Sequence, residues 1–138
     1  MRIETSFPGG VRVDANVRGF KVSTDQPAGY GGDGAAPAPF DLFLAALATC
    51  AGFYAVQFCR KRQIAIDGLA VALETSRDPE THLLSEVRIE MTLPEGFPEK
   101  YRAAIERAVD QCAVKRALDM PPRMSTVVHA PAAEFAAV

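Results

Sequence analysis

The chain has 138 residues, of which 49% are hydrophobic and 23% are charged, and its formal net charge is −2. This length predicts one domain, residues 1–138, with a core of its own, and the composition excludes a disordered chain. No basic block is longer than Arg60-Lys61-Arg62, which excludes a dedicated nucleic-acid surface because such a surface needs clustered Lys and Arg.

The N-terminal part alternates polar and apolar residues, which is the pattern of half-buried strands. Three stretches follow it: 2–7, 11–17 and 20–24. Turns are predicted between them at Pro8-Gly9-Gly10 and at Arg18-Gly19. The start of the chain has no apolar segment typical of a signal peptide. Three cysteines in an unexported chain then favour a reducing compartment, so we expect a cytoplasmic protein.

A loop and a long helix come next. Residues 26–39 (QPAGYGGDGAAPAP) have no periodicity, which predicts a functional loop or one held down by a partner. Pro39 fits the first turn of a helix that runs to about Arg62, a length of ~35 Å. This helix is apolar nearly all round but contains Asp41 and Gln57, so we expect a buried helix and not a membrane span. One chain offers little material to cover it, which favours a homodimer.

The C-terminal half predicts two strands, two helices and a closing strand. The strands span 68–77 and 83–96, joined by the polar turn Asp78-Pro79-Glu80. Helical spacing covers 98–111 and 112–120, and an apolar stretch at 123–130 predicts the last strand. The order βββ-α-ββ-αα-β predicts an α+β fold with antiparallel sheets.

Candidate chemistry centres on three cysteines and two histidines: Cys50, Cys59, Cys112, His82 and His129. These residues lie at least nine positions apart and form no CxxC, so we expect no metal site and no other cofactor. The histidines fall in a predicted turn and near the end of a predicted edge strand, which argues against a Cys–His hydrolase.

Helix geometry separates the cysteines. Cys50 and Cys59 face opposite sides of the long helix, ~13 Å apart along its axis, so they cannot pair. Lys115 follows Cys112 by three residues, and a cysteine at a helix N-terminus near cations tends towards thiolate. Free cysteines are often simply buried, and that interpretation is preferred for Cys59.

Two motifs together resemble a known family. The segment APAPFDLFLAALATC (36–50) is followed some sixty residues later by CAVKRAL (112–118). This pair, with the predicted order of elements, resembles the OsmC/Ohr family of thiol-dependent peroxidases. The resemblance implies an intertwined α+β homodimer with two active sites at the subunit interface.

The resemblance also implies residue roles. Cys50 would attack an organic hydroperoxide, Cys112 would resolve the product to a disulfide, and an external dithiol would reduce it. An arginine from the other subunit would activate the thiol; Arg18 fits that position best and Arg12 is the alternative. Aromatic residues are expected to form the substrate pocket: Phe40, Phe43, Phe53 and Tyr54.

The chain departs from the organic-hydroperoxide branch at two positions. Phe40 stands where that branch has a glutamate that holds its arginine, and Ala113 stands where a proline commonly follows the second cysteine. The sequence is therefore closer to divergent OsmC-like members. A second hypothesis stays open: a non-enzymatic protein on the same scaffold that binds an apolar ligand or senses redox state.

Overall fold

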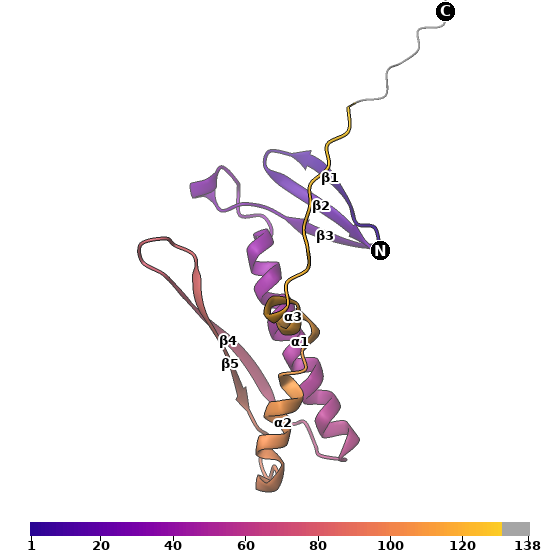
Figure 1. Cartoon of the computed structure of the whole chain (residues 1–138), viewed down its shortest axis with the longest axis vertical. Helices are drawn as coiled ribbons and strands as arrows, with labels where there is room; N and C mark the ends of the chain where they lie inside the picture. The colour runs from indigo at the N-terminus through magenta and orange to yellow at the C-terminus, as the bar shows by residue number, and fades with distance from the viewer. Residues whose placement is uncertain (131–138) are drawn as a thin grey trace, which may run out of the picture.

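The structure is a computed structural model that describes residues 1–130. Three strands, β1 (Glu4–Gly9), β2 (Arg12–Val17) and β3 (Phe20–Thr24), form an antiparallel sheet in the order β1-β2-β3. The helix α1 (Pro39–Lys61) follows, and β4 (Ala70–Arg77) and β5 (Leu84–Thr92) form a separate antiparallel hairpin. Two shorter helices complete the chain, α2 (Arg102–Val109) and α3 (Ala113–Asp119) (Figure 1). The predicted α+β class with antiparallel sheets is confirmed.

The turn between β2 and β3 forms where the sequence predicted it. Val17 pairs with Phe20, so the connection has two residues, Arg18 and Gly19. Their φ angles are 52° and 88°, which is the left-handed backbone that a type I′ hairpin turn requires. Asn16 stabilises the turn because its side-chain oxygen accepts a hydrogen bond from the Gly19 N–H at 3.0 Å. Arg18 is therefore exposed at the tip of the hairpin.

The loop between β3 and α1 is organised around a buried carboxylate. Asp25 is 1% exposed and accepts hydrogen bonds from the backbone N–H groups of Gln26, Asp33 and Ala35 at 2.8, 3.1 and 3.0 Å. These bonds, that from Ala35 foremost, hold the pKa of Asp25 below its ordinary value although burial opposes the shift. The loop is thus held down by a residue of its own chain.

The backbone passes so close to itself in this loop that Gly32 has no room for a side chain. A Cβ at this position would lie 1.9 Å from the Gln26 carbonyl oxygen and 2.8 Å from the Asp25 carboxylate. Gly32→Ala is expected to lower the free energy of unfolding by about 1–3 kcal/mol, measured by urea denaturation. Gly29→Ala is the matched control, since a Cβ there meets nothing within 4 Å. Equal stability of the two variants would contradict this account.

The helix α1 begins as predicted. Pro39 is in its first turn, and the Asp41 carboxylate accepts a hydrogen bond from the Ala38 N–H at 2.9 Å. Its C-terminal half contacts α2 and forms the core, whose buried side chains are Ala51, Ala55, Phe58, Cys59, Ile105 and Val109. Partly buried side chains of β4 and β5, among them Val71 and Ile89, pack against this core.

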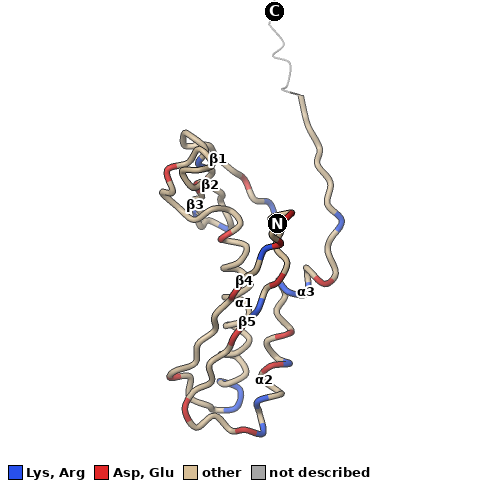
Figure 2. The backbone as a smooth tube through the Cα atoms, turned by 90° about the vertical axis from the view of Figure 1, so that its left-hand side faces the viewer, with Lys and Arg blue, Asp and Glu red and all other residues tan. Residues whose placement is uncertain are grey.

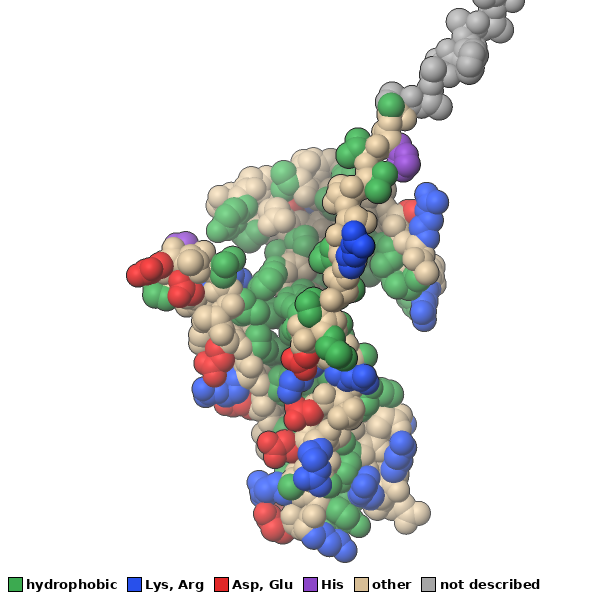
Figure 3. All heavy atoms as spheres, viewed as in Figure 1, with side chains coloured by type: hydrophobic (Ala, Val, Ile, Leu, Met, Phe, Trp, Pro, Cys, Tyr) green, Lys and Arg blue, Asp and Glu red, His purple; other side chains and the backbone are tan. Residues whose placement is uncertain are grey.

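Much of α1 stays uncovered by its own chain. By length and composition it could cross a membrane, with a mean hydropathy of 1.8, although core helices of globular proteins meet the same test. In the most apolar 18-residue stretch of α1, only 28% is buried. Apolar residues including Phe40 and Phe53 are exposed along it, and green apolar surface continues across the centre of Figure 3. The expectation of a dimer that covers this helix is therefore still a prediction.

The predicted strand at 123–130 is wrong for this single chain. Residues 121–130 have no regular secondary structure and leave α3 as an extended, exposed segment, separated from the rest of the chain in Figure 2. Their apolar side chains, including Val127 and Val128, are exposed. A strand needs a hydrogen-bonded neighbour, and none of the described strands pairs with this segment.

Candidate active site

The structure brings Cys50 and Cys112 close together. Cys50 lies midway along α1, and Cys112 is the residue that caps the N-terminus of α3, which packs against α1. The two thiols are close enough for each to shift the pKa of the other. Cys50 is half-buried, whereas Cys112 is 0% exposed. A reagent in solution can therefore reach Cys50, whereas Cys112 is shielded from solvent.

The surroundings of Cys50 favour its thiolate. Burial opposes ionisation, but hydrogen bonds from Cys112 and from the backbone N–H groups of Val114 and Ala113 outweigh it, so the pKa of Cys50 is lowered. These N–H groups belong to the first turn of α3, where they have no partner within the helix. The main chain of α3 thus supplies the donors that stabilise a thiolate.

The surroundings of Cys112 disfavour its thiolate. Burial and the neighbouring Cys50 raise its pKa, although the Lys115 N–H donates to its sulfur at 3.4 Å. The Lys115 ammonium forms an ion pair with Asp110. The general tendency of a cysteine at a helix N-terminus towards thiolate is thus outweighed at Cys112, whose thiol caps α3.

Cys59 is a core residue, as predicted. It is fully buried beside Phe58 and Ile105. Burial raises its pKa, and the charge of Arg62 offsets this only in part. Cys59 can therefore serve as an internal control for thiol chemistry.

Neither predicted arginine activates Cys50 within one chain. Arg18 lies at the exposed hairpin tip, and Arg12 donates a hydrogen bond to the Gly9 carbonyl at 3.5 Å. The lowered pKa of Cys50 comes from the thiol of Cys112 and main-chain N–H groups, with no contribution from either guanidinium. An arginine brought by a second subunit stays a prediction. Sequence reasoning missed the α3 donors because backbone groups leave no side-chain signal.

The four predicted pocket aromatics lie along α1 on both sides of the thiol. At ~100° per residue, Phe43 and Tyr54 point within about 40° of Cys50, whereas Phe40 and Phe53 point about 80° and 60° away. They form two pairs, Phe40–Phe43 and Phe53–Tyr54, each with ring centroids 5.4 Å apart.

Phe40 and Asp41 have local partners of their own. The guanidinium of Arg77 lies 5.0 Å above the centroid of the Phe40 ring. The carboxylate of Asp41 is occupied by the cap of α1. Phe40 stands where the organic-hydroperoxide branch has a glutamate, and it contacts an arginine, Arg77, through the face of its ring.

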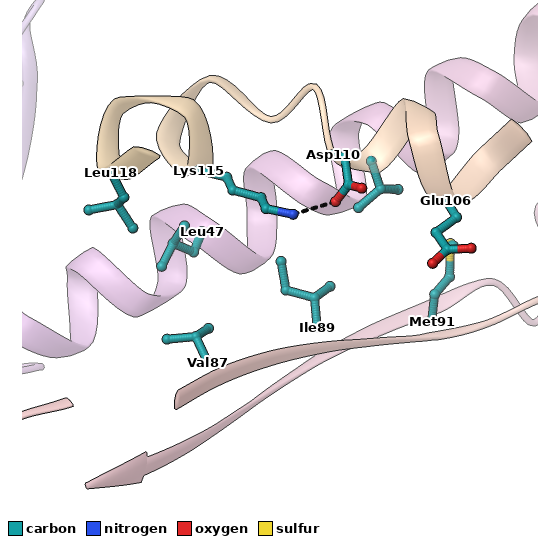
Figure 4. Close-up of a pocket in the computed structure, with 9 residues that line it drawn as sticks. Leu47, Val87, Ile89, Met91, Glu106, Asp110, Lys115 and Leu118 are labelled. Carbon is teal, nitrogen blue, oxygen red and sulfur yellow. Dashed lines mark hydrogen bonds and ion pairs between the residues drawn. The ribbon is translucent and has the colours of Figure 1, made fainter. Parts of the chain in front are cut away.

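The structure has a cavity that the sequence did not predict; neither Cys50 nor Cys112 lines it, but Leu47, one helical turn before Cys50, does. The cavity has a volume of about 300 Å³ and lies between α1, β5, α2 and α3 (Figure 4). Its floor is aliphatic, and the Lys115–Asp110 ion pair crosses its wall. The lining residues are Leu47, Val87, Ile89, Met91, Glu106, Val109, Asp110, Lys115 and Leu118.

Metal-binding geometry is not found in the part of the chain that the structure describes. Within residues 1–130, no group of three or more His, Cys, Asp or Glu side chains could hold an ion. His82 lies in the β4–β5 loop with a φ of 58°, and His129 lies in the extended segment after α3.

Comparison with known proteins gives a consistent result. Residues 31–127 match the family model described as OsmC-like protein. A search of curated proteins gives no match. Among solved structures, a Psychrobacter arcticus protein named for osmotic stress induction and a detoxification response has a TM-score of 0.71 at 23% identity, covering 83% of this chain and 85% of that one.

Two further solved structures are similar. The OsmC-like protein from Mycoplasma pneumoniae has a TM-score of 0.69 at 18% identity, with 86% of each chain covered. The organic hydroperoxide resistance protein OsmC from Legionella pneumophila has a TM-score of 0.54 at 18% identity, covering 85% of this chain and 87% of that one. At these identities the likeness shows a shared fold.

Proposed function

The chain belongs to the OsmC-like protein family, and we propose that it is a cysteine-based thiol peroxidase that reduces organic hydroperoxides. The observation that carries the proposal is that the two cysteines differ in both exposure and pKa. The accessible thiol, Cys50, has the lowered pKa, and the neighbouring buried thiol, Cys112, has the raised pKa. A nucleophile and a resolving thiol need this arrangement.

In the first step the Cys50 thiolate attacks the terminal oxygen of the hydroperoxide. A sulfur–oxygen bond forms while the O–O bond breaks, and the remaining alkoxide takes a proton and leaves as an alcohol. Cys50 is oxidised to a sulfenic acid. The N–H groups of Val114 and Ala113 hold the thiolate in place before this step.

In the second step Cys112 closes a disulfide. Its sulfur attacks the sulfur of the sulfenic acid, the S–OH bond breaks, and water leaves. The two thiols are close enough for each to shift the pKa of the other, which favours this step. An external dithiol then returns both cysteines to thiols by exchange and leaves as its own disulfide.

The alkyl part of the substrate needs an apolar surface next to Cys50. The aliphatic cavity that begins at Leu47 supports this, as do Phe43 and Tyr54 on the Cys50 side of α1. The predicted wall of Phe40, Phe43, Phe53 and Tyr54 is retained as part of the proposal. The Legionella neighbour, an organic hydroperoxide resistance protein, supports the substrate class.

The same proposal includes a cytoplasmic homodimer in which Arg18, or alternatively Arg12, approaches Cys50 of the partner subunit. The exposed apolar length of α1 supports the dimer. The exposed position of Arg18 at a hairpin tip leaves it available for such a contact.

Peptide mapping after oxidation tests the mechanism. Stoichiometric cumene hydroperoxide is expected to give one intramolecular disulfide, Cys50–Cys112, with Cys59 still a free thiol, because Cys112 is the cysteine that neighbours Cys50 whereas Cys59 is buried in the core. Cys59→Ser should form the same bridge. Cys112→Ser should stop at a sulfenic acid on Cys50 or oxidise further, since nothing resolves it. A bridge that contains Cys59, or no bridge at all, would overturn the two-cysteine mechanism.

The alternative, a non-enzymatic protein that binds an apolar ligand or senses redox state, is supported by one observation. Phe40 replaces a glutamate of the peroxidase branch, and its ring is in contact with Arg77. A disulfide that forms without turnover in the presence of dithiol would favour this function.

A further inference from the structure

A second cavity lies at the other end of α1 and is lined by positive charge. It has a volume of about 350 Å³ and lies between the last turns of α1 and the neighbouring side of α2. Its lining residues are Tyr54, Gln57, Phe58, Lys61, Arg62, Ala104, Arg107 and Ala108. We call it the basic cavity; blue Lys and Arg positions gather at this lower end of the molecule in Figure 2, and Figure 3 shows Lys and Arg side chains there.

The charges of the basic cavity are not neutralised by the described chain. Three cations line it, Lys61, Arg62 and Arg107, and no carboxylate does. Within residues 1–130 none of the three forms an ion pair, whereas the nearby Arg102 is paired with Glu99. A concave surface with charges of one sign raises the local concentration of counter-ions, so it favours an anion.

One of the three cations is held in a defined position. The guanidinium of Arg62 lies 3.7 Å from the centroid of the Phe58 ring and 5.3 Å from that of Tyr101. It also donates a hydrogen bond to the Phe58 carbonyl at 3.4 Å. A planar donor fork fixed in this way loses little conformational entropy on binding and suits the two oxygens of a carboxylate.

The other lining residues indicate that the ligand has an apolar part as well as a negative charge. Phe58, Ala104 and Ala108 are apolar, and Tyr54 adds a ring. The C-terminal carbonyl groups of α1 carry partial negative charge at this end, which disfavours a dianion compared with a monoanion. The volume is at the lower end of small-molecule sites.

We infer that the basic cavity binds a carboxylate attached to a short apolar body. Neither Cys50 nor Cys112 lines this cavity, although Tyr54, which the peroxidase proposal places on the Cys50 side of α1, does. The inference rests on the three cations and not on either thiol. Binding measured on the Cys50→Ser protein should equal that of the wild type, so failure of one proposal leaves the other intact.

Isothermal titration of the full chain with octanoate tests the site. We expect saturable binding, and we expect Lys61→Gln/Arg107→Gln to weaken it about tenfold, because two charge-assisted contacts are lost. Arg60→Gln is the matched control: it is an exposed cation of the same helical turn that does not line the cavity. It should leave the affinity within about twofold of the wild type.

Two further ligands test the contributions of the carboxylate and of the apolar chain separately. Octan-1-ol should bind about tenfold more weakly than octanoate if charge recognition is right. Inorganic phosphate should also bind more weakly if the apolar floor contributes. No octanoate binding, equal losses in Arg60→Gln and the double variant, or phosphate binding as tight as octanoate would each overturn the inference. Thermal unfolding of each variant shows that the fold is intact.

Discussion

Cys50→Ser is expected to lower the rate of organic hydroperoxide consumption by about 10³-fold or more, because a serine hydroxyl cannot replace the thiolate as nucleophile. The measurement is the loss of cumene hydroperoxide in the presence of dithiothreitol. Cys112→Ser should consume the first equivalent of peroxide and then slow sharply, since its sulfenic acid has no resolving thiol. Cys59→Ser is the matched control and should retain the wild-type rate.

The rate of this reaction should also depend on pH in a defined direction. The pKa of Cys50 is lowered, so the thiolate persists below the pH at which an ordinary cysteine is protonated, and the rate should fall only as the pH drops through that lowered pKa. A rate that keeps rising up to the pH range of an ordinary cysteine would contradict the role of the α3 N–H groups. If the wild type turns over peroxide no faster than Cys50→Ser, the peroxidase function is excluded and the ligand-binding or redox-sensing function is favoured.

Ala46→Glu is expected to convert a homodimer into a monomer. Ala46 is exposed on α1, at about 40° from Cys50 and away from the core formed with α2. If a second copy covers this face, a carboxylate would be buried there without a partner, at a cost of several kcal/mol. Size-exclusion chromatography with light scattering at micromolar concentration measures the change.

Ala103→Glu is the control for this experiment. Ala103 is an equally exposed alanine on α2, so the substitution adds the same charge on a different face. It should leave the dimer intact. A monomeric wild type, or an Ala46→Glu protein that stays dimeric, would show that α1 is not the dimer interface.

Local patterns in the sequence were sufficient for most of the secondary structure. Alternation predicted the strands, Arg18-Gly19 predicted a two-residue turn that needs left-handed backbone, and Pro39 marked the start of α1. The prediction failed at 123–130, because an apolar stretch shows only a local preference for extended backbone, while a strand also needs a hydrogen-bonded neighbour. The core position of Cys59 likewise follows from helix geometry, since nine residues turn it to the opposite side from Cys50.

The sequence by itself therefore determined the elements, the order in which they occur and the faces of α1. Only the tertiary structure decided how the two cysteines differ. The N–H groups of Ala113 and Val114 reach Cys50 because α3 packs across α1, and the same packing buries Cys112 and raises its pKa. The aliphatic cavity and the basic cavity also combine residues from distant segments. Periodicity shows which side of a helix is apolar, but main-chain donors and shared cavities depend on which elements meet.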